Sequence, residues 1–180
     1  MRVIGGALKG RRLDTPKWQG LRPTSDRLRE TLFNVLGDRV DGVQFIDGFA
    51  GTGAVGIEAL SRGAAHVTFV ETDPRAVRLI KANLRHCALK ARYTIVHVPI
   101  QRAWRKMENG SSDIIFLDPP YGHADLETVL VGAAGQLAED GLVVLEHAAR
   151  RKIDESINSL RRKRVVSAGD SALSFFDSKV

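Results

Sequence analysis

The chain has one cysteine, no long apolar run and no regular spacing of histidines. The single cysteine, Cys87, excludes an intramolecular disulfide and a thiolate-rich metal site. No apolar run approaches the roughly 18 residues that a membrane-spanning helix needs, and the N-terminal residues lack the apolar core of a signal peptide. The five histidines show no metal-ligand spacing. We therefore expect a cytoplasmic protein that has no metal site and does not contact a membrane.

Acidic residues are scarce at the start of the chain. The 180 residues carry a net charge of +6, and residues 1–30 hold eight basic but only three acidic side chains. The rest of the chain is therefore close to neutral. A basic segment on a near-neutral domain is typical of proteins that bind a polyanion, although a solvated basic arm without a partner would have the same composition.

Short apolar runs alternate with helical patterns after residue 42. The pattern predicts strands over 43–46, 67–70, 93–98, 114–117 and 142–145, separated by helices over 54–62, 74–85 and 126–137. Short, continuously apolar strands separated by helices predict a parallel sheet that is covered on both faces. We expect a doubly wound α/β fold, in which ligands bind beyond the carboxyl ends of the strands.

The two ends of the chain differ from this repeating pattern. Residues 153–160 predict a helix, and residues 164–166 and 172–176 predict an antiparallel hairpin at the sheet edge, which brings the mostly parallel sheet to seven strands. The first residues predict a small hairpin, followed by a helix over 26–36. We therefore divide the chain into a basic extension (residues 1–40) and a main domain (residues 41–180).

A glycine-rich turn follows the first predicted strand. Gly51, Gly53 and Gly56 match the G-x-G-x-x-G pattern of nucleotide-binding loops, which is weak evidence when it stands alone. Glu71 ends the next strand, 20 residues beyond Gly51, where an acid can accept hydrogen bonds from both ribose hydroxyls of an adenosine. Asp47 places a carboxylate at the strand end, which favours a cationic ligand such as S-adenosylmethionine over a pyrophosphate. We interpret Asp73 as the N-cap of the following helix.

The fourth predicted strand ends in Asp118-Pro119-Pro120-Tyr121. The prolines fix φ and remove two backbone donors, which leaves a rigid turn with exposed carbonyl oxygens. Asp118 and the Pro119 carbonyl can accept from the two N–H groups of an exocyclic amine, while Tyr121 can stack on the base. Two converging acceptors would hold the nitrogen in line with a methyl donor, and the carboxylate would stabilise its developing positive charge.

The Asp-Pro-Pro-Tyr turn resembles motif IV of the amino-methyltransferases, and residues 47–56 resemble their motif I. The basic segment is more specific. Its Arg-Val-Ile-Gly-Gly run (residues 2–6), its Lys-Gly-Arg (residues 9–11) and its Arg-Pro-Thr-Ser-Asp-Arg-Leu-Arg-Glu (residues 22–30) resemble the bacterial 16S ribosomal RNA guanine-N2 methyltransferases of the RsmD-like family. The resemblance extends over essentially the whole chain.

This resemblance implies a function and a set of site residues. The function is transfer of a methyl group from S-adenosylmethionine to N2 of a guanine in 16S rRNA, within a 30S particle or an assembly intermediate, by a monomer. The target-base site would be Asp118, Pro119, Pro120 and Tyr121. The cofactor site would be Asp47, Phe49, Ala50, Gly51, Gly53, Glu71, Thr72 and Ile100, and the RNA contacts would be Arg11, Arg12, Arg22, Thr24, Arg27 and Arg29. Ile100 departs from the small polar or acidic residue that many relatives place near this point, and we expect it to pack on the adenine.

Three other functions are compatible with parts of the pattern. A DNA adenine-N6 methyltransferase uses the same four-residue turn, but 180 residues leave little room for a domain that reads a DNA sequence. A non-catalytic RNA-binding factor on the same fold would not need Asp118 and Glu71. A nicotinamide oxidoreductase would need a proton donor and a substrate-binding half, neither of which is evident.

Overall fold

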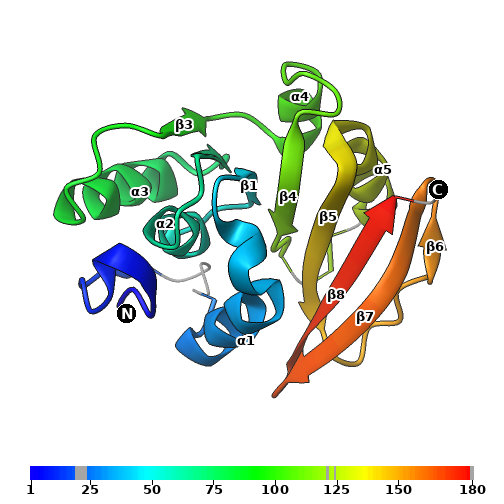
Figure 1. The fold of residues 1–180 in the computed structure, drawn as a ribbon, viewed down its shortest axis with the longest axis horizontal. Coiled ribbons are helices and arrows are strands. Elements are labelled where there is room, and N and C mark those ends of the chain that lie inside the picture. Colours follow the sequence, from blue (N-terminus) through cyan, green and yellow to red (C-terminus); the bar gives the residue numbers. More distant parts are fainter. Residues whose placement is uncertain (19–23, 121, 124, 179–180) are drawn as a thin grey trace.

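A twisted sheet forms the centre of the protein (Figure 1). The computed structural model describes residues 1–18, 24–120, 122–123 and 125–178, and within these residues eight strands form one sheet in the order β3-β2-β1-β4-β5-β8-β7-β6. Five of them run parallel: β1 (Gln44–Gly48), β2 (His66–Val70), β3 (Tyr93–Val96), β4 (Ser112–Leu117) and β5 (Leu137–Ala148). The antiparallel edge contains β6 (Ser156–Ile157), β7 (Leu160–Ala168) and β8 (Ser171–Ser178).

Helices cover both faces of this sheet. Successive side chains along a strand point to opposite faces, so the apolar strands present apolar side chains on both. On one face, Phe116 and Val144 belong to the core beneath α1 (Asp26–Leu36), α2 (Ala54–Ser61) and α3 (Pro74–His86). On the other face, Leu117 and Leu145 pack beneath α4 (Ile100–Trp104) and α5 (Leu126–Gln136). The predicted doubly wound α/β fold with its mostly parallel sheet is confirmed.

The chain reverses its winding direction at β1, which lies between β2 and β4. The helices that follow these two strands, α3 after β2 and α5 after β4, lie on opposite faces of the sheet. Such a switch point opens a crevice at the carboxyl edge of the sheet. The glycine-rich turn follows β1 and the Asp118 turn follows β4. The topology therefore brings both motifs to one crevice.

The prediction of a helix over residues 153–160 is wrong. These residues instead lead into β6, and Ile157 pairs with Leu160 across a tight turn in which Asn158 has φ of 50°. Apolar residues at 153, 157 and 160 mimic a helical face, but Ile157 and Leu160 are buried against the second core as a hairpin pair. The predicted hairpin after this segment is confirmed as β7 and β8, so the short β6 adds an eighth strand to the seven expected.

The N-terminal forty residues pack onto the same body. A hairpin forms as the Val3 N–H donates to the Arg11 carbonyl (2.9 Å) and the Leu13 N–H donates to that of Met1 (3.0 Å). A short 3₁₀ turn, η1 (Gly6–Leu8), lies between the two arms of this hairpin, and a second, η2 (Gly37–Val40), follows α1. Val3 and Leu13 are buried in the core beneath α1 and α2. No helix in the described part of the chain has the length and apolar character that crossing a bilayer requires.

Candidate functional site

A cavity of about 310 Å³ opens at the carboxyl edge of the sheet, a volume within the usual range of small-molecule sites. Its lining follows the strand order. Glu71 and Thr72 follow β2, residues 49–52 follow β1, Asp118 to Pro120 follow β4, and Glu146 belongs to β5. Thr24, Ser25 and Leu28, at the start of α1, also line the cavity. One cavity therefore joins the predicted cofactor loop to the predicted base site.

The glycine-rich turn is held by its neighbours. The buried Asp47 carboxylate accepts a hydrogen bond from the Gly56 N–H at 2.8 Å, which ties the end of β1 to the first turn of α2. A Cβ added at Gly56 would lie 2.3 Å from a ring carbon of Phe69, so the close approach of α2 to the sheet requires glycine there. Gly51 has φ of 54°, a conformation that glycine adopts without strain. The backbone of this turn can therefore approach a ligand closely.

Glu71 links the glycine-rich turn to the end of β2. Its Oε2 accepts from the Gly51 N–H at 2.8 Å, and its Oε1 accepts from the N–H groups of Thr72 (2.7 Å) and Asp73 (2.9 Å). These bonds fix the carboxylate at the cavity wall. Asp73 itself caps α3 by accepting from the Arg75 N–H at 2.7 Å, as predicted. The side-chain hydrogen bond from Arg75 lowers the pKa of Asp73 to about 2.

The Asp118 turn is anchored from two sides. The Asp118 N–H donates to the Gly48 carbonyl (3.2 Å), and the Thr24 hydroxyl donates to Asp118 Oδ2 (3.1 Å). Thr24 lies just before Ser25, which caps α1 by accepting from the Leu28 N–H. The segment before α1 thus reaches the carboxylate that the sequence predicts to hold a base.

The cavity is strongly acidic. Among the described lining residues, Asp47, Glu71, Asp118 and Glu146 are carboxylates and none is lysine or arginine. Burial raises the pKa of Asp47 well above its usual value, and the charges of Asp118 and Glu71 raise it further, against the lowering effect of the Gly56 N–H. Such a cavity favours a cationic ligand and opposes the pyrophosphate of a nicotinamide dinucleotide.

Comparison with known proteins agrees with this geometry. The family model described as Conserved hypothetical protein 95 matches residues 1–177. The Bacillus subtilis protein named "Putative rRNA methyltransferase YlbH" is 36% identical over 181 residues, which cover 98% of both chains. The Escherichia coli protein named "Ribosomal RNA small subunit methyltransferase D" is 40% identical over 148 residues, which cover 81% of this chain and 74% of that one. The chain belongs to this RsmD-like methyltransferase family.

A solved structure extends the agreement to the whole fold. The Escherichia coli protein described as "Putative methyltransferase yhhF" has 30% sequence identity and a TM-score of 0.87, and the match covers 99% of this chain and 98% of that one. The resemblance to the RsmD-like family, which the N-terminal motifs suggested, is therefore confirmed.

Not every predicted site residue of this RsmD-like chain lies on the cavity. Ile100 and Gly53 are absent from the described lining, and the buried Ile100 instead packs beside Gly48. The predictions for Arg22 and Tyr121 lie outside the described residues. Arg11, Arg12 and Arg27 are exposed, and Thr24 lines the cavity.

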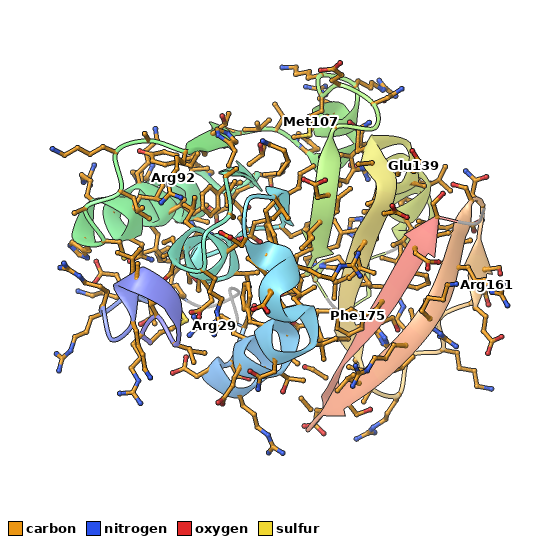
Figure 2. All side chains as sticks on the ribbon, in the orientation of Figure 1. Arg29, Arg92, Met107, Glu139, Arg161 and Phe175 are labelled. Atoms are coloured by element: carbon orange, nitrogen blue, oxygen red, sulfur yellow. The ribbon has the colours of Figure 1, made fainter. Side chains whose placement is uncertain are left out.

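The prediction for Arg29, which lies on α1 (Figure 2), is wrong. We predicted that it contacts RNA phosphates, but its side chain is 0% exposed. Its guanidinium donates to the Arg2 carbonyl at 2.8 Å and lies 3.5 Å from the equally buried Glu58 carboxylate. Glu58 also accepts from the N–H groups of Ile4 (2.8 Å) and Gly5 (2.7 Å). Arg29 therefore holds the N-terminal segment and α1 against α2 and cannot reach an RNA phosphate.

Sequence reasoning missed the far end of the cavity. Glu146 and Ser171, on the adjacent strands β5 and β8, line it there and are 5% and 7% exposed. A signal for Glu146 was present, because it follows the apolar run 142–145 as Asp118 follows 114–117. Ser171 carries no comparable signal. The other lining residues that we did not predict are Ser25, Leu28, Thr52, Ala54, Val55 and Phe116.

Proposed function

We propose that the protein transfers the methyl group of S-adenosylmethionine to the exocyclic N2 amine of a guanine in 16S rRNA. The observation that carries this proposal is that Glu71 and the Asp118-Pro119 turn line the same acidic cavity. The printed names of the relatives, which describe ribosomal RNA methyltransferases, support the substrate class.

The residues at the β1–β2 end of the cavity fit this cofactor. Glu71 is fixed by three backbone N–H groups at the wall, where it would accept from the ribose hydroxyls. Asp47 and Glu71 favour a ligand that carries a sulfonium and an ammonium group. Phe49, Ala50, Gly51 and Thr72 would enclose the rest of the molecule. When bound, S-adenosylmethionine supplies an activated methyl group.

The Asp118 turn would hold the amine that is methylated. An exocyclic amine is a poor nucleophile because its lone pair is delocalised into the base. Asp118 Oδ and the Pro119 carbonyl oxygen would accept from its two N–H bonds and orient the nitrogen toward the methyl group. Asp118 would also stabilise the positive charge that develops on nitrogen, and the proton would leave afterwards, so no strong base is required beforehand.

The N-terminal segment would bring the RNA to this site. Arg11, Arg12 and Arg27 are exposed and free to approach phosphates, and Thr24 connects the start of α1 to Asp118. We propose residues 1–40 as the RNA-contacting extension of a catalytic domain over residues 41–180. The protein would act as a monomer on a 30S particle or an assembly intermediate, in the cytoplasm.

A transfer assay tests this proposal. Purified protein and S-adenosylmethionine with a tritiated methyl group would be incubated with 30S particles from a strain that lacks the activity, with free 16S rRNA and with DNA. We expect N2-methylguanosine in the digested rRNA and no label in the DNA. N6-methyladenine in DNA as the sole product would contradict the proposal, and so would a protein that binds RNA without transferring label.

A further inference from the structure

Glu146 is a carboxylate in the cavity to which neither the predicted cofactor site nor the predicted base site assigns a role. The register of β4 and β5 ends at the pair Leu117–Leu145, and Asp118 and Glu146 each come directly after it. Neighbouring parallel strands lie about 4.8 Å apart, so the two backbones are adjacent. Both residues line the cavity.

The two carboxylates also share a face of the sheet. Phe116 and Val144, two residues earlier on the same strands, both belong to the core beneath α1 and α2. Side chains repeat every second residue along a strand, so Asp118 and Glu146 project to that side as well. Glu146 is only 5% exposed. It is therefore a nearly buried acceptor beside the carboxylate that would hold the target amine.

Glu146 lies on the side of Asp118 that faces away from the cofactor loop. The strand order β2-β1-β4-β5 places Glu71 and the glycine-rich turn on one side of Asp118 and Glu146 on the other. Glu146 therefore lies beside Asp118 on the side away from the predicted cofactor site.

We infer that Glu146 selects guanine by accepting a hydrogen bond from its N1–H, an inference that rests on the proposed function. Guanine carries two adjacent donors on this edge, the N2 amine and N1–H, and two neighbouring carboxylates match them. Adenine carries an acceptor at N1 beside its N6 amine. A carboxylate facing that lone pair would be repelled by it, which is costly in a buried site.

This role explains how a turn that also suits adenine could serve guanine alone. The Asp118 turn recognises only an NH₂ group, which both bases have. The second acceptor distinguishes the hydrogen-bonding pattern next to that group. Glu146 would therefore be a specificity-determining residue of the base site, and we expect its effect on base choice to exceed its effect on cofactor binding.

The test uses a base that keeps the amine and loses the N1 proton. In 2-aminopurine, N2 is still an amine but N1 is an acceptor. We would compare 30S particles reconstituted with 16S rRNA that carries guanine or 2-aminopurine at the methylated position. Wild-type protein should prefer guanine by at least about 10²-fold in kcat/KM, because sites built around a substrate donor reject analogues that lack it.

The Glu146→Gln variant should remove this preference. The Gln amide can donate to N1 of 2-aminopurine and accept from N1–H of guanine, so the ratio should fall to within about tenfold. 2-Aminopurine also lacks the O6 atom of guanine. This loss affects wild type and variant equally, so it cancels when their guanine to 2-aminopurine ratios are compared. Glu139→Gln is the matched control, because Glu139 is exposed at the opposite end of β5 (Figure 2). It should retain the wild-type ratio.

Each outcome separates this inference from the proposed function. If wild-type protein methylates guanine and 2-aminopurine equally well, the inference fails without any variant being needed. An unchanged ratio in Glu146→Gln also overturns it, and tenfold weaker binding of S-adenosylhomocysteine together with that unchanged ratio would assign Glu146 to the cofactor. If wild-type protein methylates no guanine in 16S rRNA, the proposed function itself fails.

Discussion

Asp118 is the residue on which the proposed chemistry depends. Its carboxylate would contact the target amine and not the cofactor, so Asp118→Ala should lower methyl transfer by about 10²–10³-fold while the Kd for S-adenosylmethionine stays unchanged. Single-turnover kinetics and calorimetry measure the two quantities. Asp125→Ala is the control, because Asp125 is exposed and its side chain does not cap α5. Equal losses of transfer and of cofactor affinity would show that Asp118 acts elsewhere.

The buried Asp47 lowers the stability of the fold and raises the affinity for a cationic cofactor. Because burial raises its pKa, an ionised Asp47 costs the folded state free energy. Asp47→Asn keeps an acceptor for the Gly56 N–H and removes the charge. We expect Tm to rise by about 2–4 °C, which corresponds to about 1 kcal/mol, and cofactor affinity to fall. Asp38→Asn, at an exposed position, should change neither. A lower Tm for Asp47→Asn would contradict this account.

The same shift predicts a pH dependence. A raised pKa in the folded state means that protonation of Asp47 favours folding, so its contribution is complete below the unfolded pKa of about 3.9 and is lost as pH rises through the folded value. The stability difference between Asp47→Asn and wild type should therefore be smallest in acid and grow with pH. Denaturant unfolding at several pH values measures it, and a difference that shrinks as pH rises would be inconsistent with this assignment.

At the scale of elements, a buried ion pair attaches α1 to α2. Arg29→Ala would leave Glu58 with only part of its compensation and should destabilise the protein by about 3 kcal/mol, a fall in Tm of about 6–12 °C. Arg27→Ala, on the same helix but exposed, should change stability by less than about 0.5 kcal/mol. Thermal unfolding compares them. If Arg29→Ala melts like Arg27→Ala, the pair does not hold the helix.

The helix and strand pattern could be predicted wherever local signals and packing agree. Short apolar runs predicted β1, β2, β4 and β5, which lie inside the sheet with their apolar residues mostly buried, and the edge strand β3, which is only half-buried, was predicted from its β-branched and aromatic residues. The helix over 153–160 failed because Ile157 and Leu160 are buried by pairing within a hairpin, which local spacing does not reveal. The prediction that Arg29 contacts RNA failed for a related reason. Helical spacing places Arg29 with Leu32 and Phe33 on the apolar face of α1, which was a signal of burial. Its partner Glu58 comes from a distant helix, and spacing within α1 does not reveal that contact.

The candidate site also has one part that the sequence predicts and one part that it does not. Asp47, Glu71 and Asp118 could be predicted because each ends a parallel strand, and such ends meet at one edge of a sheet. The contact of Thr24 with Asp118 joins residues 94 positions apart and follows only from the docking of α1. Sequence spacing alone therefore does not predict that the start of α1 forms part of the site.

The whole molecule separates its charges. The cavity is acidic, whereas the exposed arginines of the first thirty residues are basic and would meet the phosphates. Replacing Arg11, Arg12 and Arg27 together by alanine should weaken binding to 30S particles and reduce the slope of log K against log[salt] by about 0.7–0.9 per lost phosphate contact. Arg105→Ala/Lys106→Ala, exposed residues after α4, is the control. An unchanged slope in the triple variant would move the RNA surface elsewhere.

A structure of the protein with S-adenosylhomocysteine tests the central claim most directly, because that claim is spatial: one acidic cavity holds the methyl donor beside the Asp118 turn. We predict that the ribose hydroxyls lie on Glu71 and that the sulfur faces the space between Asp118 and the Pro119 carbonyl. A ligand bound outside this cavity, or a sulfur turned away from Asp118, would contradict the account.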